Sequence, residues 1–437
     1  MLDVNLIRKN SEEIKKGVAT KNVDSKVVDD FLAIDTQWRE LTVKSEEKKA
    51  LLNKLSKERN IEEAKKVKLD FKKLEDELKS IEDERLKKLR LIPNLPLPDV
   101  PIAKDESGNV VLREVGTKRD FSKEEFTPKN YLALTEELGI IDTKRAAKVS
   151  GTRFGYFLGA AAQLEFALIQ FVINTVTNQK IIKELIDKNN LTLSATPFIP
   201  VIPPVLVGRT AMAAMGYMDR GIEEIYHLPE DDLFLVGTSE QSIGPMHMDE
   251  VFDAEDLPRR YLGFSTCFRR EAGSHGKDTK GILRVHQFDK LEMFSFVKPE
   301  DSAAEHKLLL AIEEYLMQQL ELPYHVLHIC SADLGDPAAA KYDIEAWMPG
   351  QNESRGQYRE THSTSNTTDY QARRLNVRFR QKDNSLGFVH TLNGTAFAIG
   401  RALIAIFENY QQKDGSIATP KALQQYTSFS QIEKSPR

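Results

Sequence analysis

The 437-residue sequence has few cysteines, no long apolar run and no strong charge of either sign. Its two cysteines, Cys267 and Cys330, are too few for a disulfide framework or a cysteine-rich zinc site, and no zinc is expected. We expect both to be buried free thiols in a reducing compartment. The formal net charge of -5 excludes a globally basic nucleic-acid-binding protein, so any contact with nucleic acid must be local.

Neither the N-terminus nor the most apolar segment predicts export or a membrane. The opening residues, MLDVNLIRKNSEEIKKG, carry charges where a secretory signal needs an apolar run. The apolar run 164–176 is interrupted by Glu165, Gln170 and Asn174 and is too short to span a bilayer. We therefore expect a cytoplasmic protein with no membrane partner.

Residues 27–92 contain no glycine and are rich in Lys, Glu and Leu. Apolar residues recur there at heptad spacing, and the register breaks around Asn60. They are Phe31, Ile34, Trp38, Leu41, Leu52 and Leu55, then Ala64, Val67, Phe71, Leu74, Leu78 and Ile81. The pattern predicts two helices of about 30 residues, each about 45 Å long, folded back as an antiparallel hairpin.

The charge of this hairpin allows more than one function. Residues 44–90 hold 16 Lys and Arg against 12 Asp and Glu, a modest positive excess in a negative chain. By composition alone, the segment could be a solvated coiled coil for dimerisation or spacing, and its positive excess is only a modest indication of a phosphate-binding surface.

Prolines at 93, 96, 98 and 101 forbid a helix in the segment that follows and favour a semi-rigid linker. We therefore predict a helical hairpin domain over 1–92, a linker over 93–109 and a second domain over 110–437. In the second domain, helices are expected over 122–138, 159–188 and 303–320, the last packing on a sheet.

Residues 264–294 are predicted to form two strands with facing charges around a glycine-bearing loop. A period of two puts Arg269 and Glu271 on one face of the first strand, and Arg284, Phe288 and Glu292 on one face of the second. Arg can bind phosphate with two N–H groups, Phe can stack on a base, and a carboxylate can hold an ammonium group. The segment therefore suits a nucleotide and a small charged substrate.

The pattern of this hairpin, F-R-x-E, a loop and then R-V-H-Q-F-x-K-x-E, closely resembles motif 2 of class II aminoacyl-tRNA synthetases, in its seryl-tRNA synthetase version. Two further segments resemble the other motifs of that class, in the same order. TPFIPVIPPVL, residues 196–206, resembles motif 1, an edge or dimer-interface segment whose proline would be Pro203 or Pro204. GFVHTLNGTAFAIGRALIAIFENY, residues 387–410, resembles motif 3 and reads as a strand, a turn at Gly394 and an apolar helix.

Arg401 lies inside that apolar helix. A buried Arg is costly unless an anion meets it. The anion would be the terminal phosphate of ATP, as the resemblance implies, or a core acid such as Glu408.

The resemblance implies an α+β fold: an N-terminal antiparallel helical hairpin, then a class II synthetase core of mostly antiparallel β-sheet flanked by helices, in a homodimer. It also implies an enzyme, a serine–tRNA ligase that uses ATP and Mg²⁺ to make seryl-adenylate from L-serine. The serine would then pass to the acceptor end of tRNA(Ser), and of tRNA(Sec) as well. The hairpin would bind the long variable arm of the tRNA, with phosphate contacts expected at its tip, residues 54–68.

The resemblance also assigns site residues. The catalytic residues would be Arg269, Glu271 and Arg401. Serine would be bound by Thr238, Ser239, Glu240, Arg269, Glu292 and Thr395. ATP would be bound by Arg269, Arg270, Glu271, Arg284, Val285, Phe288, Glu360, Thr361, His362, Ser363 and Arg401.

The magnesium ligands implied by the resemblance are Glu360 and Ser363. Residues at this spacing do not share a face of an ideal strand, so we expect a bulge between them. His362 stands where many relatives have a small hydroxyl residue, so it could be a structural histidine rather than a ligand.

Three other functions remain open at this point. A plain coiled-coil scaffold would not explain an Arg in an apolar helix. An amino-acid:carrier-protein ligase would share the active site but normally lacks the hairpin, and residues 27–92 argue against it. A non-catalytic, synthetase-like RNA-binding protein would be expected to have lost Arg269, Glu271 or Arg401, and all three are present.

Overall fold

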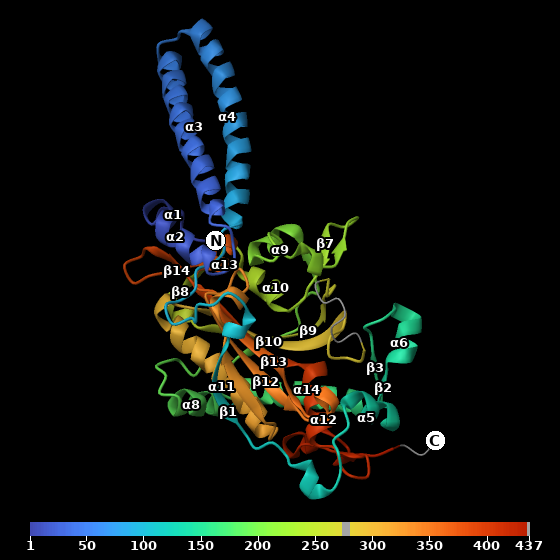
Figure 1. The fold of residues 1–437 in the computed structure, drawn as a ribbon. Coiled ribbons are helices and arrows are strands. Elements are labelled where there is room, and N and C mark those ends of the chain that lie inside the picture. Colours follow the sequence, from blue (N-terminus) through green and yellow to red (C-terminus); the bar gives the residue numbers. More distant parts are fainter. Residues whose placement is uncertain (273–279, 435–437) are drawn as a thin grey trace. The chain divides into compact units, whose positions relative to one another are not determined.

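The computed structural model describes residues 1–272 and 280–434 (Figure 1). The chain divides by its internal contacts into two compact units, Met1–Leu95 and Pro96–Arg437. The division falls inside the proline-rich segment 93–109. We refer to the two parts as the N-terminal unit and the core unit.

The N-terminal unit is helical, as the heptad pattern predicts. Its helices are α1 (Val4–Lys9), α2 (Ser11–Ala19), α3 (Lys26–Lys57) and α4 (Ile61–Arg90). The long pair α3 and α4 forms a hairpin (Figure 1). Its connection is at Asn60, whose side chain caps α4 by accepting a hydrogen bond from the Glu63 N–H.

A buried carboxylate fixes the base of this hairpin. Asp35 of α3 is fully buried and accepts hydrogen bonds from Arg8 of α1 at 2.8 Å and from Arg85 of α4 at 2.7 Å. A second pair, Lys88 with Asp30 at 3.1 Å, links the same two long helices. Removing one partner of a buried charge leaves the other uncompensated, so these residues specify how the hairpin closes.

The core unit is built on one eight-stranded sheet, in the order β1-β11-β12-β13-β16-β10-β9-β4. Neighbouring strands are antiparallel except β4, which pairs parallel with β9 at the sheet edge. The strands are β1 (Val110–Val115), β4 (Ile199–Val201), β9 (Arg259–Phe268), β10 (Gln287–Val297), β11 (Tyr324–His328), β12 (Ala340–Met348), β13 (Gln357–Asn366) and β16 (His390–Ala398). The predicted α+β class with a mostly antiparallel sheet is confirmed.

Helices with buried apolar faces cover the sheet and enclose the main hydrophobic core. They include α5 (Tyr131–Leu138), α7 (Ala160–Val176), α8 (Gln179–Lys188), α11 (Ser302–Gln319) and α14 (Ile399–Asn409). Helix α11 packs against β16 and β13, as predicted for residues 303–320. Helix α14 packs against β12 and β10, which places its N-terminal turn beside the centre of the sheet.

Shorter elements surround this framework. The other helices are α6 (Thr143–Ser150), α9 (Arg209–Met215), α10 (Glu240–Ile243), α12 (Gln351–Ser354) and α13 (Tyr370–Leu375). The described ranges also form four small sheets. Two of them have two strands: β2 (Ile141–Asp142) with β3 (Tyr156–Phe157), and β17 (Ile417–Ala418) with β18 (Gln431–Ile432). The other two have three strands: β7 (Leu233–Leu235) between β5 (Leu206–Gly208) and β6 (His227–Leu228), and β14 (Arg378–Arg380) between β8 (Val251–Asp253) and β15 (Leu386–Phe388).

Two predicted helices differ from the structure. Residues 159–188 form two helices, α7 and α8, bent by 69°, and the side chain of Asn178 caps the second one. The helix predicted over 122–138 begins only at Tyr131, after a 3₁₀ turn at 121–124 and Pro128. Within the described ranges, 1–272 and 280–434, no single helix is long and apolar enough to cross a membrane. By length and composition, only the bent α7–α8 pair could do so.

Gly394 lies inside β16, so the turn predicted there is wrong. A Cβ atom at this position would lie 3.0 Å from Glu313 Oε1 and 3.1 Å from Thr364 Oγ1. The glycine therefore permits a close approach of β16 to α11 and β13 rather than a change of chain direction.

Candidate active site

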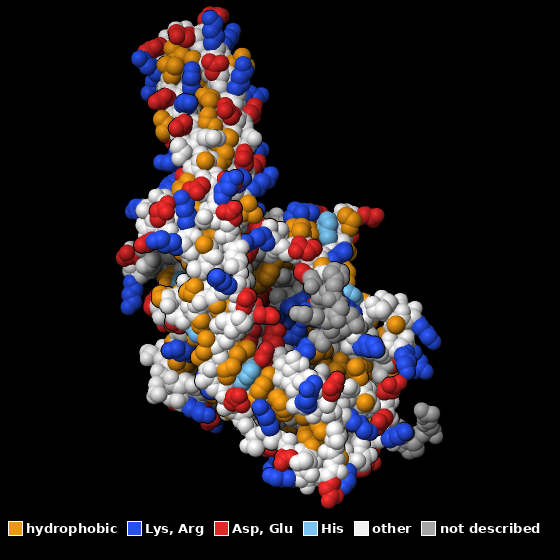
Figure 2. All heavy atoms as spheres, viewed as in Figure 1, with side chains coloured by type: hydrophobic (Ala, Val, Ile, Leu, Met, Phe, Trp, Pro, Cys, Tyr) orange, Lys and Arg blue, Asp and Glu red, His pale blue; other side chains and the backbone are white. Residues whose placement is uncertain are grey.

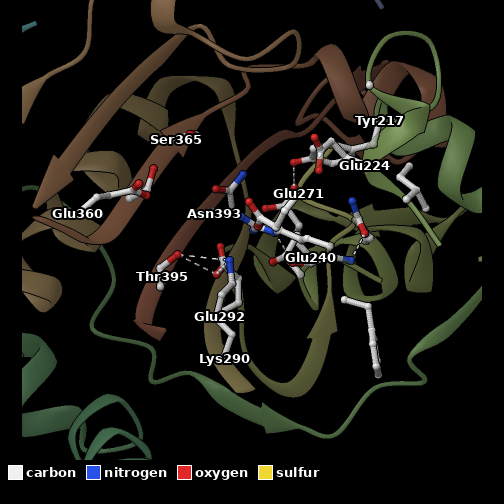
Figure 3. Close-up of a pocket in the computed structure, with 18 of the residues that line it drawn as sticks. Tyr217, Glu224, Glu240, Glu271, Lys290, Glu292, Glu360, Ser365, Asn393 and Thr395 are labelled. Atoms are coloured by element: carbon white, nitrogen blue, oxygen red, sulfur yellow. Dashed lines mark hydrogen bonds and ion pairs between the residues drawn. The ribbon is translucent and has the colours of Figure 1, made fainter. Parts of the chain in front are cut away.

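A cavity of about 690 Å³ opens on the sheet of the core unit, over β9, β10, β13 and β16 (Figure 3). Figure 2 shows acidic and basic side chains meeting in a hollow of the core unit. The cavity brings together ten of the predicted site residues: Thr238, Glu240, Arg269, Glu271, Arg284, Glu292, Glu360, Ser363, Thr395 and Arg401. A smaller adjoining cavity adds Val285, Phe288 and Thr361.

Three buried polar residues form one end of the cavity. Glu292 of β10 lies opposite Thr395 of β16, at a point where the register shifts by one residue. The Thr395 hydroxyl donates to Glu292 Oε2 at 3.1 Å, and Lys290 Nζ lies 2.5 Å from the same oxygen (Figure 3). Because the buried ammonium of Lys290 balances the buried carboxylate, this end of the cavity is polar without an uncompensated charge.

A second buried carboxylate lies close to this group. Glu240 begins α10, is 3% exposed, and accepts a hydrogen bond from the hydroxyl of Tyr217. Burial, and then the charge of Glu292, raises the pKa of Glu240 to about 7. Thr238 lines the same wall, and its buried Oγ1 has no hydrogen-bond partner in the described part of the chain, so it is suited to meet a ligand.

The arginines of the predicted hairpin lie just beyond its strands. Strand β9 ends at Phe268, although the Arg269 N–H still donates to the His286 carbonyl at 3.0 Å. The guanidinium of Arg269 lies 5.3 Å from the centre of the Phe288 ring, and its Nε donates to the Gly237 carbonyl. Arg269 therefore joins the aromatic wall of the cavity to the wall that bears Glu240.

Glu271 has a positive φ of 51°, so the predicted strand alternation does not extend to it. Its carboxylate still faces the second half of the hairpin and accepts a hydrogen bond from Arg284 Nη1 at 2.8 Å. The predicted facing charges, Glu271 and Arg284, therefore lie just beyond the ends of β9 and β10 and not within the strands. Most of the predicted glycine-bearing loop, residues 273–279, lies outside the described residues.

The bulge predicted between Glu360 and Ser363 is confirmed. In the pairing of β12 with β13, Ile344 lies opposite His362 and Glu345 lies opposite Glu360, which leaves Thr361 as the extra residue. A bulge of this kind redirects side chains along a strand. Both Glu360 and Ser363 consequently line the main cavity.

Arg401 ends in the cavity and not in the apolar core. Its side chain is 25% exposed, and its Nη1 lies 3.0 Å from Glu360 Oε2. Loss of water around the carboxylate raises the pKa of Glu360. The charges of Arg401 and Lys341 outweigh this effect and lower that pKa to about 2. Glu408, the alternative partner, instead accepts hydrogen bonds from the backbone N–H groups of Tyr131 and Gly350.

Three predicted site residues do not line either cavity: Ser239, Arg270 and His362. The Ser239 hydroxyl is fully buried and donates to the Gly263 carbonyl at 3.4 Å. The Arg270 guanidinium lies over the ring of Tyr226 at 4.9 Å.

His362 also differs from its predicted role as an ATP ligand, because it lies in the core. It is 1% exposed, and its ring centre lies 5.0 Å from that of Phe397. Burial lowers the pKa of His362 to about 3, so the ring is neutral at physiological pH. The structure therefore favours the alternative of a structural histidine.

Sequence reasoning missed Lys290, Tyr217 and Lys341, all of which line the main cavity. A signal existed for Lys290, because a period of two places residues 288, 290 and 292 on one strand face. No comparable local signal marks Tyr217, which reaches Glu240 from the loop after α9.

Glu360 and Ser363 supply the hard oxygen donors that Mg²⁺ prefers. Asp343, opposite Ser363 on β12, is a third nearby oxygen group. Burial raises the pKa of Asp343 to about 6, although the charge of Lys341 opposes this shift. Within the described ranges, no group of three or more His, Cys, Asp or Glu side chains could hold a metal ion. The oxygen groups of Glu360 and Ser363 are chemically compatible with a magnesium ion.

The antiparallel sheet and its arginine-lined, carboxylate-lined cavity define a class II aminoacyl-tRNA synthetase core. Residues 225–410 match the family described as tRNA synthetase class II core domain (G, H, P, S and T), and residues 1–96 match the seryl-tRNA synthetase N-terminal domain. The chain belongs to the seryl-tRNA synthetase family.

Individual relatives match this chain over its whole length. It is 42% identical to a serine–tRNA ligase of Dictyoglomus turgidum, with 99% of both chains covered. The crystal structure of seryl-tRNA synthetase from Pyrococcus horikoshii complexed with ATP superposes with a TM-score of 0.87 at 39% identity, over 100% of both chains. The cytoplasmic serine-tRNA ligase of Naegleria fowleri in complex with AMP gives 0.85 at 32% identity, over 100% of this chain and 99% of that one.

Proposed function

We infer that the chain is a serine–tRNA ligase, which activates L-serine with ATP to seryl-adenylate and pyrophosphate and then transfers the serine to the 3′ end of tRNA(Ser). The observation that carries this function is the cavity, in which a polar, carboxylate-bearing end adjoins an end lined by arginines. Relatives named as serine–tRNA ligases, 42% identical over nearly all of the chain, support it and favour none of the alternatives.

Activation of serine needs alignment and charge neutralisation more than a general base, because a carboxylate is already a nucleophile at neutral pH. We propose that Arg269, between the two ends of the cavity, holds the serine carboxylate and the α-phosphate. Phe288 would stack on adenine, and Glu271 would accept a hydrogen bond from its amino group. The contact of the Arg269 guanidinium with the Phe288 ring supports this arrangement.

The other two arginines would bind the bent phosphates, Arg284 near the middle and Arg401 at the γ-phosphate. Both now bond carboxylates, Glu271 and Glu360 respectively, at 2.8 and 3.0 Å. A triphosphate would compete for these cations, and a magnesium ion held by Glu360 and Ser363 would neutralise the phosphates further.

Selection of serine would depend on its hydroxyl and its size. Thr238, Glu240, Glu292 and Thr395 offer buried acceptors and hydroxyls for the ammonium and the hydroxyl of serine. A site that hydrogen-bonds a substrate hydroxyl rejects an analogue without it by factors of about 10⁴, since its own polar groups are then left unpaired. Alanine and glycine would be refused on this ground, and threonine by its extra methyl group.

We propose that the α3–α4 hairpin binds the long variable arm of tRNA(Ser), and of tRNA(Sec), in the cytoplasm. The match of residues 1–96 to the family's N-terminal domain supports a hairpin adapted to this enzyme. A homodimer through the segment that resembles motif 1 is supported by exposed apolar side chains. Ile199 and Ile202, on and beside edge strand β4, are 56% and 85% exposed.

The function is tested by pyrophosphate exchange into ATP with serine, threonine and alanine, each with and without tRNA bearing a long variable arm. We expect exchange with serine alone and without tRNA, followed by charging of that tRNA. Absence of exchange with all three amino acids would overturn the proposed function.

A further inference from the structure

A second large cavity of the core unit, of about 610 Å³, lies between α5, β2, α6 and the segment 152–154. We call it the α6 cavity. Its lining includes four cations, Lys144, Arg145, Arg153 and Lys280, and the aromatic ring of Phe154. The acids that line it are Glu136 and Asp142. Its volume lies in the range of ligand sites, and its walls are positive on balance in a chain of net charge -5.

The α6 cavity shares a wall with the active site. Arg153 Nη1 donates to the Glu271 carbonyl at 3.3 Å, and the Arg153 carbonyl accepts a hydrogen bond from the His286 N–H at 3.0 Å. The Tyr131 hydroxyl accepts from the Ile282 N–H at 3.0 Å, and Ile282 lines the small cavity beside Phe288. A chain of phosphates lying in the α6 cavity would therefore end next to the nucleotide site.

The exposed cations of α6 can bind such phosphates. Lys144 and Lys148 are four residues apart, so they share a helix face, and Arg145 flanks them. The ion pairs Lys144–Glu136 and Arg145–Asp142 involve exposed cations, and such pairs contribute little stability, so a phosphate can displace them. Lys148 has no carboxylate within 4 Å in the described ranges.

We propose that the α6 cavity, with Lys144 and Arg145 in its wall and Lys148 one turn further along α6, binds the acceptor end of the tRNA. This inference rests on the proposed function, which requires an RNA 3′ end to reach the activated serine. Cations that follow a backbone, with an aromatic ring for an unpaired base, are what single-stranded nucleic acids bind. Phe154, half-buried and with its ring 5.4 Å from that of His286, is that aromatic group.

The test compares the double variant Lys144→Glu/Lys148→Glu with a matched control on α8, Lys180→Glu/Lys183→Glu. Both remove two exposed lysines from one helix face, and both break one exposed ion pair, Lys183–Asp187 in the control. Three quantities are measured on the full chain: serine-dependent pyrophosphate exchange, kcat/KM for charging of full-length tRNA, and kcat/KM for charging of an acceptor minihelix without the long arm.

We expect the α6 variant to keep wild-type exchange and to lose on the order of tenfold in kcat/KM for both RNAs. Its slope of log kcat/KM against log salt concentration should be shallower by about 1.4, since each single-strand phosphate contact contributes about 0.7. The control should match the wild type in all three measurements.

Three results would overturn the inference: unchanged charging by the α6 variant, a loss seen with full-length tRNA but not with the minihelix, or an equal loss in the control. Dissociation of a wild-type dimer by the α6 variant, checked by sedimentation, would assign the surface to a second copy of the chain instead. Failure of the proposed function itself would be distinct, because the wild type would then show no serine-dependent exchange.

Discussion

Replacing Glu292 with alanine should abolish serine-dependent activation while leaving the ATP end of the cavity intact. The Glu292 carboxylate is 1% exposed and is bonded by Lys290 and Thr395, so its removal leaves the buried ammonium of Lys290 uncompensated. Breaking such a pair costs about 3–5 kcal/mol of stability. Loss of a hydrogen bond to a charged group costs about 1.5–3 kcal/mol more in substrate binding.

The uncompensated ammonium of Lys290 would also repel the ammonium of serine. The lost hydrogen bond and this repulsion act on substrate binding, and together they should amount to about 4.1 kcal/mol, a factor of about 10³ in kcat/KM for serine. Pyrophosphate exchange measures that factor, and ATP binding measured by calorimetry checks that the rest of the site persists. If alanine at 292 prevents folding, Glu292→Gln keeps the shape without the charge. Serine turnover within threefold of the wild type in a folded Glu292 variant would refute the assignment.

Three further predictions concern other parts of the chain. Burial raises the pKa of Glu240 to about 7. Above pH 4.5 the folded state therefore holds more protons than the unfolded state, so the free energy of unfolding should fall as pH rises from about 5 to 8. In urea titrations, Glu240→Gln should make this fall less steep. The pairs Lys88–Asp30 and Lys48–Asp70 show that residues 40 and 78 lie opposite each other on α3 and α4. Deleting residues 40–78 therefore joins neighbouring points of the two helices and keeps the Asp35 ion pairs. Serine-dependent exchange should survive this deletion and tRNA charging should be lost, whereas retained charging would make the hairpin purely structural. His362→Ser should lower the free energy of unfolding by about 1–3 kcal/mol, because the ring contact with Phe397 is lost. It should leave KM for ATP within threefold, and a larger change would show that the histidine contacts the nucleotide.

Much of the candidate site could be predicted because its residues lie on regular strands. A period of two correctly placed Phe288 and Glu292 on one face of β10, and the spacing of Glu360 and Ser363 correctly required a bulge. The heptad spacing and its break at Asn60 likewise predicted the α3–α4 hairpin.

The prediction failed where a contact between distant segments decides the role of a residue. His362 is adjacent to a bulge, and only the packing of β13 against β16 turns its ring toward Phe397 and away from the cavity. Arg401 looked buried in an apolar helix, yet the position of α14 beside β13 brings its guanidinium to Glu360. The bend between α7 and α8 and the close approach at Gly394 are likewise products of packing.

The sequence by itself determined the local structure of this protein and the chemistry of its site, because periodicity and charged groups are properties of short segments. Tertiary structure alone decided which distant charged and polar groups bond to one another. Lys290, Glu292 and Thr395 meet through strand register over more than a hundred residues, and Arg8, Asp35 and Arg85 meet through helix docking. Such pairings depend on the summed geometry of loops, bulges and packed faces, which no local pattern contains.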